Sequence, residues 1–303
     1  MQFVWCYIQR EALGNEIELS IASVRKFYQG EARITVVGDT PYKYDGHLIS
    51  KTRIIEKDFP RYRDVMSKMQ FIVEHPEVDE EFVWMMDDTY FIQSVTYADL
   101  QVQRSEPVWN RSEINEWQKR KSATMDILAA QGYSTIDYAT HLPHLIRKGS
   151  LRRVFEEFDV YGAVLLWENV YHNIHGTPTI PYYPFFGRIL IPSDRQMIEA
   201  QVGECTIVNN SNKAWNNPLQ QWLCDRIGVE YVSPQRMKLE LRKVVKKPVT
   251  GLGDVVEAGL SAVGVTKHTV KRIKQRITGN PNADCNCDGR QVWLNDLVPF
   301  SRK

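Results

Sequence analysis

Short apolar runs alternate with amphipathic segments along the first part of the chain. Residues 3–8 form a run of β-branched and aromatic side chains, which predicts a buried strand. Apolar residues then recur at helical spacing over residues 17–28, and a second strand is predicted over residues 32–37. A third strand is expected at residues 47–50 or 53–56. Because predicted strands alternate with predicted helices, we expect an α/β fold with a mostly parallel sheet flanked by helices.

The next apolar run ends in two acidic residues. A helix is predicted over residues 62–74, and the apolar run at residues 81–86 follows it. The ends of the predicted strands carry three polar pairs, namely Gln9-Arg10, Gly38-Asp39 and Asp87-Asp88. The carboxyl ends of parallel strands meet at one edge of a sheet, where the ligands of such folds bind. We therefore expect the three polar pairs to converge on one site.

The middle of the chain is predicted to be largely helical. Over residues 99–159 the longest candidate helix covers residues 113–130, and Pro143 is expected to start another, since proline is tolerated in the first turn. Residues 162–192 are rich in Tyr, Trp, His and Pro. A final helix at residues 219–227 is expected to complete a main domain of residues 1–235.

The charge of the chain is unevenly distributed. The formal net charge of the 303 residues is +1, but residues 236–276 hold eleven basic residues against three acidic ones. Residues 1–235 are therefore acidic, and residues 236–303 are predicted to form a basic helical tail with a Cys-x-Cys end at Cys285 and Cys287. A basic amphipathic helix can bind nucleic-acid phosphates, an anionic membrane or an acidic partner, or present a solvated face.

Cysteine usage and hydropathy favour a cytoplasmic protein. The five cysteines are scattered and odd in number, unlike the disulfide framework of a small secreted domain. No apolar run approaches the roughly 20 residues of a membrane span, and the residues after Met1 lack the pattern of a secretory signal. The sequence leaves the oligomeric state open.

Adjacent carboxylates at a strand end favour a metal site. Two neighbouring negative charges repel each other, and a bound cation relieves the repulsion. Mg²⁺ and Mn²⁺ prefer oxygen ligands and often share them with substrate phosphates. The sequence thus predicts that Asp87 and Asp88 hold Mn²⁺ or Mg²⁺, with a solvated turn as the alternative.

Several short motifs, in this order, resemble those of two groups of enzymes. The strand ending in Asp87-Asp88 is similar to the aspartate motif of GT-A glycosyltransferases and looks even more like the acidic motif of stealth-type sugar-phosphate transferases. The matching elements are Val36-Val37-Gly38-Asp39, a helix with Asp64 and Lys68, and His141-Leu142-Pro143-His144. The departures are Gln9-Arg10, where the stealth group has Asp-Gly, and Thr89 at the third acidic position. The segment from Cys285 resembles a tail found in bacteriophage-encoded proteins, which would place the protein in the host cytoplasm.

The resemblance implies a GT-A-like, Rossmann-like domain. It also implies a divalent cation and a nucleotide-sugar donor, for which a UDP-sugar is favoured. The candidate donor-binding residues are Gln9, Arg10, Asp39, Asp64, Lys68 and Asp87. The candidate general base is Glu168, followed by Asp159, and the histidines can supply a proton or a third metal ligand. Among them we expect His144 in catalysis and His172 beside Asp87 and Asp88, while His141 and His175 share these options. The structural alternatives are an Asp64–Lys68 ion pair, a turn capped by Asp39 and histidines that serve packing.

Three functions are consistent with these features. The first is metal-dependent transfer of a sugar to an acceptor hydroxyl, for which a hydroxymethylated base in phage DNA, a glycan or a protein is a candidate acceptor. The second is stealth-like transfer of hexose 1-phosphate in glycan synthesis. The third is a non-catalytic protein on a degenerate transferase fold that binds nucleic acid or another partner.

Overall fold

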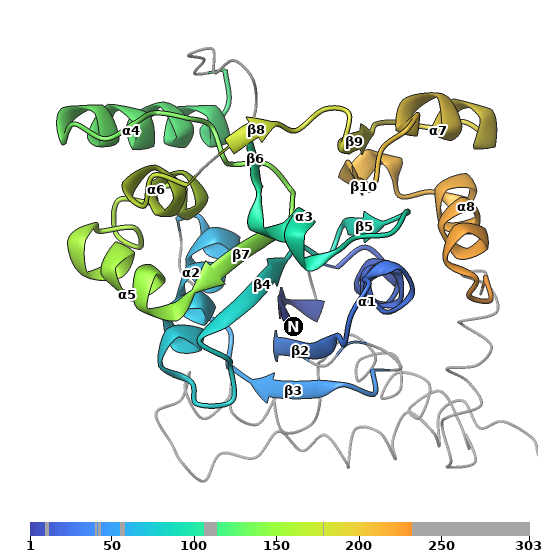
Figure 1. Ribbon diagram of the computed structural model, residues 1–303, viewed down its shortest axis with the longest axis horizontal. Coiled ribbons are helices and arrows are strands. Elements are labelled where there is room, and N and C mark those ends of the chain that lie inside the picture. The colour runs from blue at the N-terminus through green and yellow to red at the C-terminus, as the bar shows by residue number, and fades with distance from the viewer. Residues whose placement is uncertain are drawn as a thin grey trace, which may run out of the picture. The chain divides into compact units, whose positions relative to one another are not determined.

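A sheet with one antiparallel edge forms the centre of the structure (Figure 1). In the described part of the chain this sheet has the order β3-β2-β1-β4-β7, with β1 (Gln2–Tyr7), β2 (Arg33–Gly38), β3 (His47–Ser50), β4 (Glu81–Met85) and β7 (His144–Arg147). The strands β1 to β4 are parallel, and β7 pairs antiparallel with β4. The expected α/β fold with a mostly parallel sheet is therefore confirmed.

The structure is a computed structural model that describes residues 1–231 except 10–11, 40, 42–43, 55–57, 106–113 and 178. The predicted basic tail, with Cys285 and Cys287, lies outside the described residues, and so does Arg10. Over residues 1–231 the chain forms one compact unit. No helix within this described part has the length and apolar character needed to cross a membrane.

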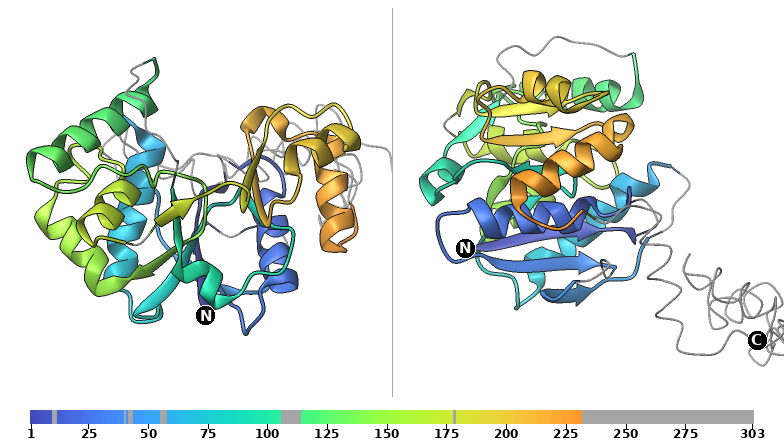
Figure 2. Two further views of the ribbon diagram at one scale, coloured as in Figure 1. Left: turned by 45° about the horizontal axis from the view of Figure 1, so that its top comes forward. Right: turned by 90° about the vertical axis from the view of Figure 1, so that its right-hand side faces the viewer.

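Helices cover both faces of the sheet. On one face lie α2 (Pro60–Glu74), α4 (Glu116–Ala130), α5 (Lys148–Glu157) and α6 (Trp167–Ile174), and on the other lie α1 (Glu16–Phe27) and α8 (Asn217–Ile227) (Figure 2). Alternate residues of a strand point to opposite faces. Val4 and Trp84 therefore pack with the first group of helices, while Phe3 and Val83 pack on the side of α1.

Smaller strands extend the fold beyond the carboxyl end of β4. They form a sheet of order β5-β10-β9, with β5 (Thr89–Phe91), β10 (Ile207–Asn210) and β9 (Phe186–Ile189), and a ribbon of β6 (Gln103–Ser105) with β8 (Thr179–Pro181). The remaining elements are α3 (Tyr97–Gln101), α7 (Arg195–Val202) and the short helix η2 (Asn212–Ala214). Since β5 starts one residue after Asp88, its pairing with β10 brings residues 207–210 next to the acidic pair.

The first part of the chain follows the prediction, and in the middle α4 matches the helix predicted over residues 113–130 while the segment after Pro143 differs. The strands near residues 3–8, 32–37 and 47–50 are confirmed. The prediction that Pro143 starts a helix is wrong, because residues 144–147 form β7. There Ile146 is fully buried and Arg147 exposed, and this alternation lets β7 pair with β4 at the sheet edge.

Candidate active site

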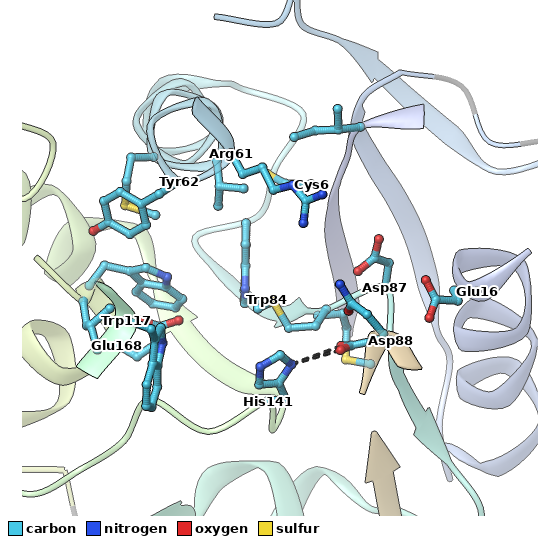
Figure 3. A pocket seen from close by; sticks show the side chains of 18 of the residues that line it. Cys6, Glu16, Arg61, Tyr62, Trp84, Asp87, Asp88, Trp117, His141 and Glu168 are labelled. Carbon is cyan, nitrogen blue, oxygen red and sulfur yellow. Dashed lines mark hydrogen bonds and ion pairs between the residues drawn. The ribbon is translucent and has the colours of Figure 1, made fainter. Parts of the chain in front are cut away.

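A cavity of about 350 Å³ opens at the carboxyl ends of β1 and β4 (Figure 3). From β1 the chain continues to β2 and β3 on one side of the sheet, whereas β4 lies on the other side. Such a reversal of strand order leaves a crevice beyond the strand ends, and ligands of open α/β sheets bind there. Cys6 and Ile8 line the cavity from β1 and the loop after it, and residues 84–88 line it from β4 and its exit.

Three carboxylates meet at one wall of this cavity. Burial and the neighbouring charge of Asp88 raise the pKa of Asp87 to about 6. Glu16, at the start of α1, accepts a hydrogen bond of 2.8 Å from Asn210 Nδ2. Burial, followed by the charges of Asp87 and Asp88, raises the pKa of Glu16 to about 8. A cation bound at this wall would favour the ionised forms of these carboxyl groups.

His141 lies beside the acidic pair. Its Nδ1 is 3.2 Å from Asp88 Oδ1, and the charge of Asp88 raises the pKa of the imidazole. Thr89 Oγ1 donates a hydrogen bond of 2.7 Å to the carbonyl oxygen of His141. The residue after Asp88 thus holds the loop that carries His141 over the end of β4.

Glu168 and two arginines belong to the rest of the lining. Glu168 is in the first turn of α6, and burial raises its pKa to about 7. The guanidinium of Arg120 lies 3.7 Å from the centroid of the Tyr62 ring, and its Nε donates to Val164 O at 2.9 Å. In Figure 3, Glu168 lies across the cavity from Asp87, and Arg61 reaches in from α2. Acidic and basic walls therefore face a common space.

The acidic pair suits a divalent cation that takes its other ligands from a substrate. Within residues 1–231, as far as they are described, no three His, Cys, Asp or Glu side chains are grouped to hold a metal. Asp87 and Asp88 provide two adjacent carboxylates on a cavity wall, and Mg²⁺ commonly binds one or two carboxylates together with phosphate oxygens and water. The pair fits such an ion, which would neutralise the charge on a diphosphate.

The structure pairs His172 with His144 instead of bringing it to Asp87 and Asp88. His144 Nδ1 lies 2.9 Å from His172 Nε2, and neither residue lines the cavity. Burial lowers the pKa of His144 to about 4, and burial also lowers the pKa of His172 well below its ordinary value. Both rings are then neutral, and one pattern satisfies all four nitrogens: Thr177 donates to His172, His172 to His144, and His144 to Thr140 O. The pair joins β7 to α6, so the expected roles in catalysis and metal binding lose their geometric basis.

Asp64 and Lys68 form a buried ion pair under the sheet edge. Each side chain is 1% exposed, and Asp64 also accepts a hydrogen bond of 2.7 Å from the backbone N–H of Ile54. A Cβ at Gly38 would lie 2.6 Å from Lys68 Cε, so the glycine leaves room for the lysine. Neither Asp64 nor Lys68 lines the cavity. The two side chains bond to each other outside the cavity lining, which leaves their expected contact with a donor without geometric support.

The remaining predicted residues have local partners outside the cavity. The backbone N–H of Gln9 donates to Asp39 Oδ2 at 3.0 Å, which ties together the ends of β1 and β2. Asp159 is exposed and accepts a hydrogen bond of 2.8 Å from the N–H of Gly162 in a turn. Since Asp159 does not line the cavity, Glu168 is the better placed of the two expected bases.

Glu16, Arg61 and Arg120 were not expected from the sequence. Glu16 begins a predicted helix, and acidic residues are common in the first turn of a helix because they interact favourably with its dipole. Arg120 lies within a predicted helix whose hydrophobic pattern is weak, so its inward face could not be identified. Arg61 directly precedes the helix predicted over residues 62–74, and nothing in the local pattern marked it as a site residue.

The sequence matches no family model and no curated protein. Among solved structures it resembles the galactosyltransferase LgtC in complex with donor and acceptor sugar analogues, with a TM-score of 0.48, 9% identity, and 78% of this chain and 99% of that chain covered. An active-site mutant of LgtC gives a TM-score of 0.46 with 10% identity over 78% of this chain and 98% of the other. The apo form of the glycosyltransferase GlyE of Streptococcus pneumoniae TIGR4 gives a TM-score of 0.42 with 10% identity. That match covers 82% of this chain and 64% of the GlyE chain.

Proposed function

We propose that this protein is a metal-dependent glycosyltransferase that uses a nucleotide sugar. The observation that carries the proposal is the pair Asp87 and Asp88 at the exit of a buried strand, on the wall of a cavity at the point where the strand order reverses. Mn²⁺ or Mg²⁺ held by this pair would supply charge neutralisation for the departing diphosphate. The cavity volume of about 350 Å³ lies within the range of small-molecule sites.

The cationic and aromatic residues of the cavity suit the nucleotide. Arg61 and Arg120 place guanidinium groups in its lining, and guanidinium groups bind phosphate oxygens with two parallel hydrogen bonds. Trp117 is 41% exposed and presents an aromatic surface on which a base or a sugar can stack. We favour a UDP-sugar as the donor.

Glu168 is the proposed base. Its pKa of about 7 lets it accept a proton near neutral pH, as general base catalysis requires. In the net reaction, the acceptor oxygen bonds to the anomeric carbon, and the bond from that carbon to the diphosphate breaks. The electron pair of the broken bond leaves with the diphosphate, and the acceptor proton goes to Glu168.

Product analysis tests the proposal and separates it from sugar-phosphate transfer. The protein is incubated with a panel of nucleotide sugars and Mn²⁺, and released nucleotides are resolved by chromatography. We expect a nucleoside diphosphate, and expect Asp88→Asn to abolish its release while Asp159→Asn, in an exposed turn, retains it. Release of a nucleoside monophosphate would instead indicate transfer of a sugar phosphate. Absence of any metal-dependent nucleotide binding would indicate the non-catalytic alternative.

A further inference from the structure

A second cavity of about 550 Å³ adjoins the first. It shares Trp117 and His141 with the first cavity, so a ligand in one would lie next to a ligand in the other. Its lining differs in charge, because it contains Arg188 but no aspartate or glutamate. Apart from Ala139, the other lining residues are polar or aromatic, namely Asn115, Gln118, Thr140, Tyr182, Phe186 and Asn209.

Asn209 in this lining has unsatisfied hydrogen-bonding groups. Its side chain is fully buried, and neither Oδ1 nor Nδ2 has a hydrogen-bond partner. Thr140, which is 8% exposed, likewise has a buried Oγ1 without a partner. Buried polar side chains almost always find partners in folded proteins, so each exception requires an explanation. A ligand with hydroxyl groups in the second cavity would supply the missing donors and acceptors.

In the small sheet, Asn209 lies between Arg188 on one neighbouring strand and Thr89, the residue after the acidic pair, on the other. Asn209 on β10 is in register with Thr89 on β5 and with Arg188 on β9. Residues in register on neighbouring strands point to the same face of a sheet. Thr89 directly follows Asp88 and is bonded to the carbonyl of His141. One face of this sheet thus runs from the proposed metal site, past Asn209, to Arg188.

Arg188 contributes a positive charge to the lining of the second cavity. Its side chain is exposed and makes no ion pair with any residue that the structure describes. Arg188 lines this cavity together with His141, which also lines the first cavity. A guanidinium without a carboxylate partner, beside amide and hydroxyl groups, suits a hydroxylated anion.

We propose that the second cavity binds the acceptor and that the acceptor is an acidic saccharide. Arg188 would bind a carboxylate or phosphate on the sugar, and Asn209 and Thr140 would bind its hydroxyl groups. The proposal rests on the proposed function, since it treats the adjoining cavity as the donor site. Carboxylate and phosphate share the same recognition chemistry here, and the experiment distinguishes them.

The test is calorimetric titration of the full-length protein, without donor, with matched saccharides. The probes are a disaccharide ending in glucuronate, the same disaccharide ending in glucose, and a disaccharide ending in glucose 6-phosphate. We expect at least one of the two anionic probes to bind ten times more tightly than the neutral one, and the tighter of them identifies the anion. Equal affinity for all three probes would overturn the proposal.

Matched variants assign the binding to this cavity. Arg188→Gln should remove the preference for the anion, Arg188→Lys should restore part of it, and Asn209→Asp should weaken anion binding through repulsion. The control is Arg195→Gln on the exposed face of α7, where Arg195 pairs with Glu199 and Asp225. An anion preference that survives Arg188→Gln, or tighter binding of a DNA oligonucleotide than of any saccharide, would contradict the proposal. Failure here leaves metal-dependent binding of a nucleoside diphosphate intact, so it is distinguishable from failure of the proposed function.

Discussion

Replacing Glu168 with glutamine should make the protein more stable and inactive at the same time. The pKa of Glu168 is raised from 4.5 to about 7 because burial disfavours the charged form. The folded protein therefore binds this proton more tightly than the unfolded chain. Stability from this group is fully present below pH 4.5 and is lost as the pH rises from about 4.5 to 7.

The size of the effect follows from the pKa shift. Each pKa unit corresponds to about 1.4 kcal/mol. Above pH 7 the buried charge of Glu168 therefore lowers the free energy of unfolding by at most roughly 3 kcal/mol. Glu168 retains some exposure to the cavity, which reduces the expected value to about 1–3 kcal/mol. We expect Glu168→Gln to raise the free energy of unfolding by this amount at pH 8 and to leave it unchanged near pH 4.

The assay is urea unfolding of both proteins at pH 4 and pH 8, in EDTA and without nucleotide, with turnover measured in parallel. In the wild type, kcat/KM should rise about tenfold per pH unit below 7 and level off above it, because the base must be unprotonated. Glu156→Gln on the exposed side of α5 is the control and should change neither quantity. A Glu168→Gln variant that is no more stable at pH 8, or that keeps wild-type turnover, would refute the role of this carboxylate.

Two further substitutions test the other corrected or newly identified residues. Lys68→Met leaves the Asp64 carboxylate buried without its partner, so the free energy of unfolding at pH 7 should fall by about 3–5 kcal/mol in urea titrations; a loss below 1 kcal/mol would show that the pair is not buried in solution. Arg120→Lys keeps the charge but loses the planar group stacked on Tyr62, and calorimetry should show about tenfold weaker binding of nucleoside diphosphate. An unchanged affinity would remove Arg120 from the donor site.

The features predicted well from sequence are local ones. Asp87 and Asp88 follow a run of buried apolar residues without interruption, so their position at a strand exit depends only on neighbouring residues. The mostly parallel sheet follows from the alternation of strands and helices in the first part of the chain. Both inferences use periodicity, which is a property of a short segment.

The features that were missed depend on contacts between distant segments. Spacing alone gives Asp64 and Lys68 as a pair on one helix face, but it cannot show that this face is buried below β2. Glu16 joins the acidic wall through Asn210, which is 194 residues away along the chain. The pairing of His144 with His172 likewise requires β7 and α6 to pack together. The sequence identified Asp64, Lys68, His144 and His172 as chemically capable side chains, whereas their direction and partners, and the place of Glu16, were set by the tertiary fold.

The most direct test of the central claim is calorimetric titration of UDP into the wild type and Asp88→Asn, each with Mn²⁺ and with EDTA. The claim is that Asp87 and Asp88 hold a cation that binds the diphosphate. We expect wild-type affinity to fall at least a hundredfold in EDTA, and Asp88→Asn to bind equally weakly with and without Mn²⁺ while its unfolding curve remains cooperative. UDP binding by the wild type that is equally tight in EDTA, or Mn²⁺-dependent binding retained by Asp88→Asn, would contradict the claim.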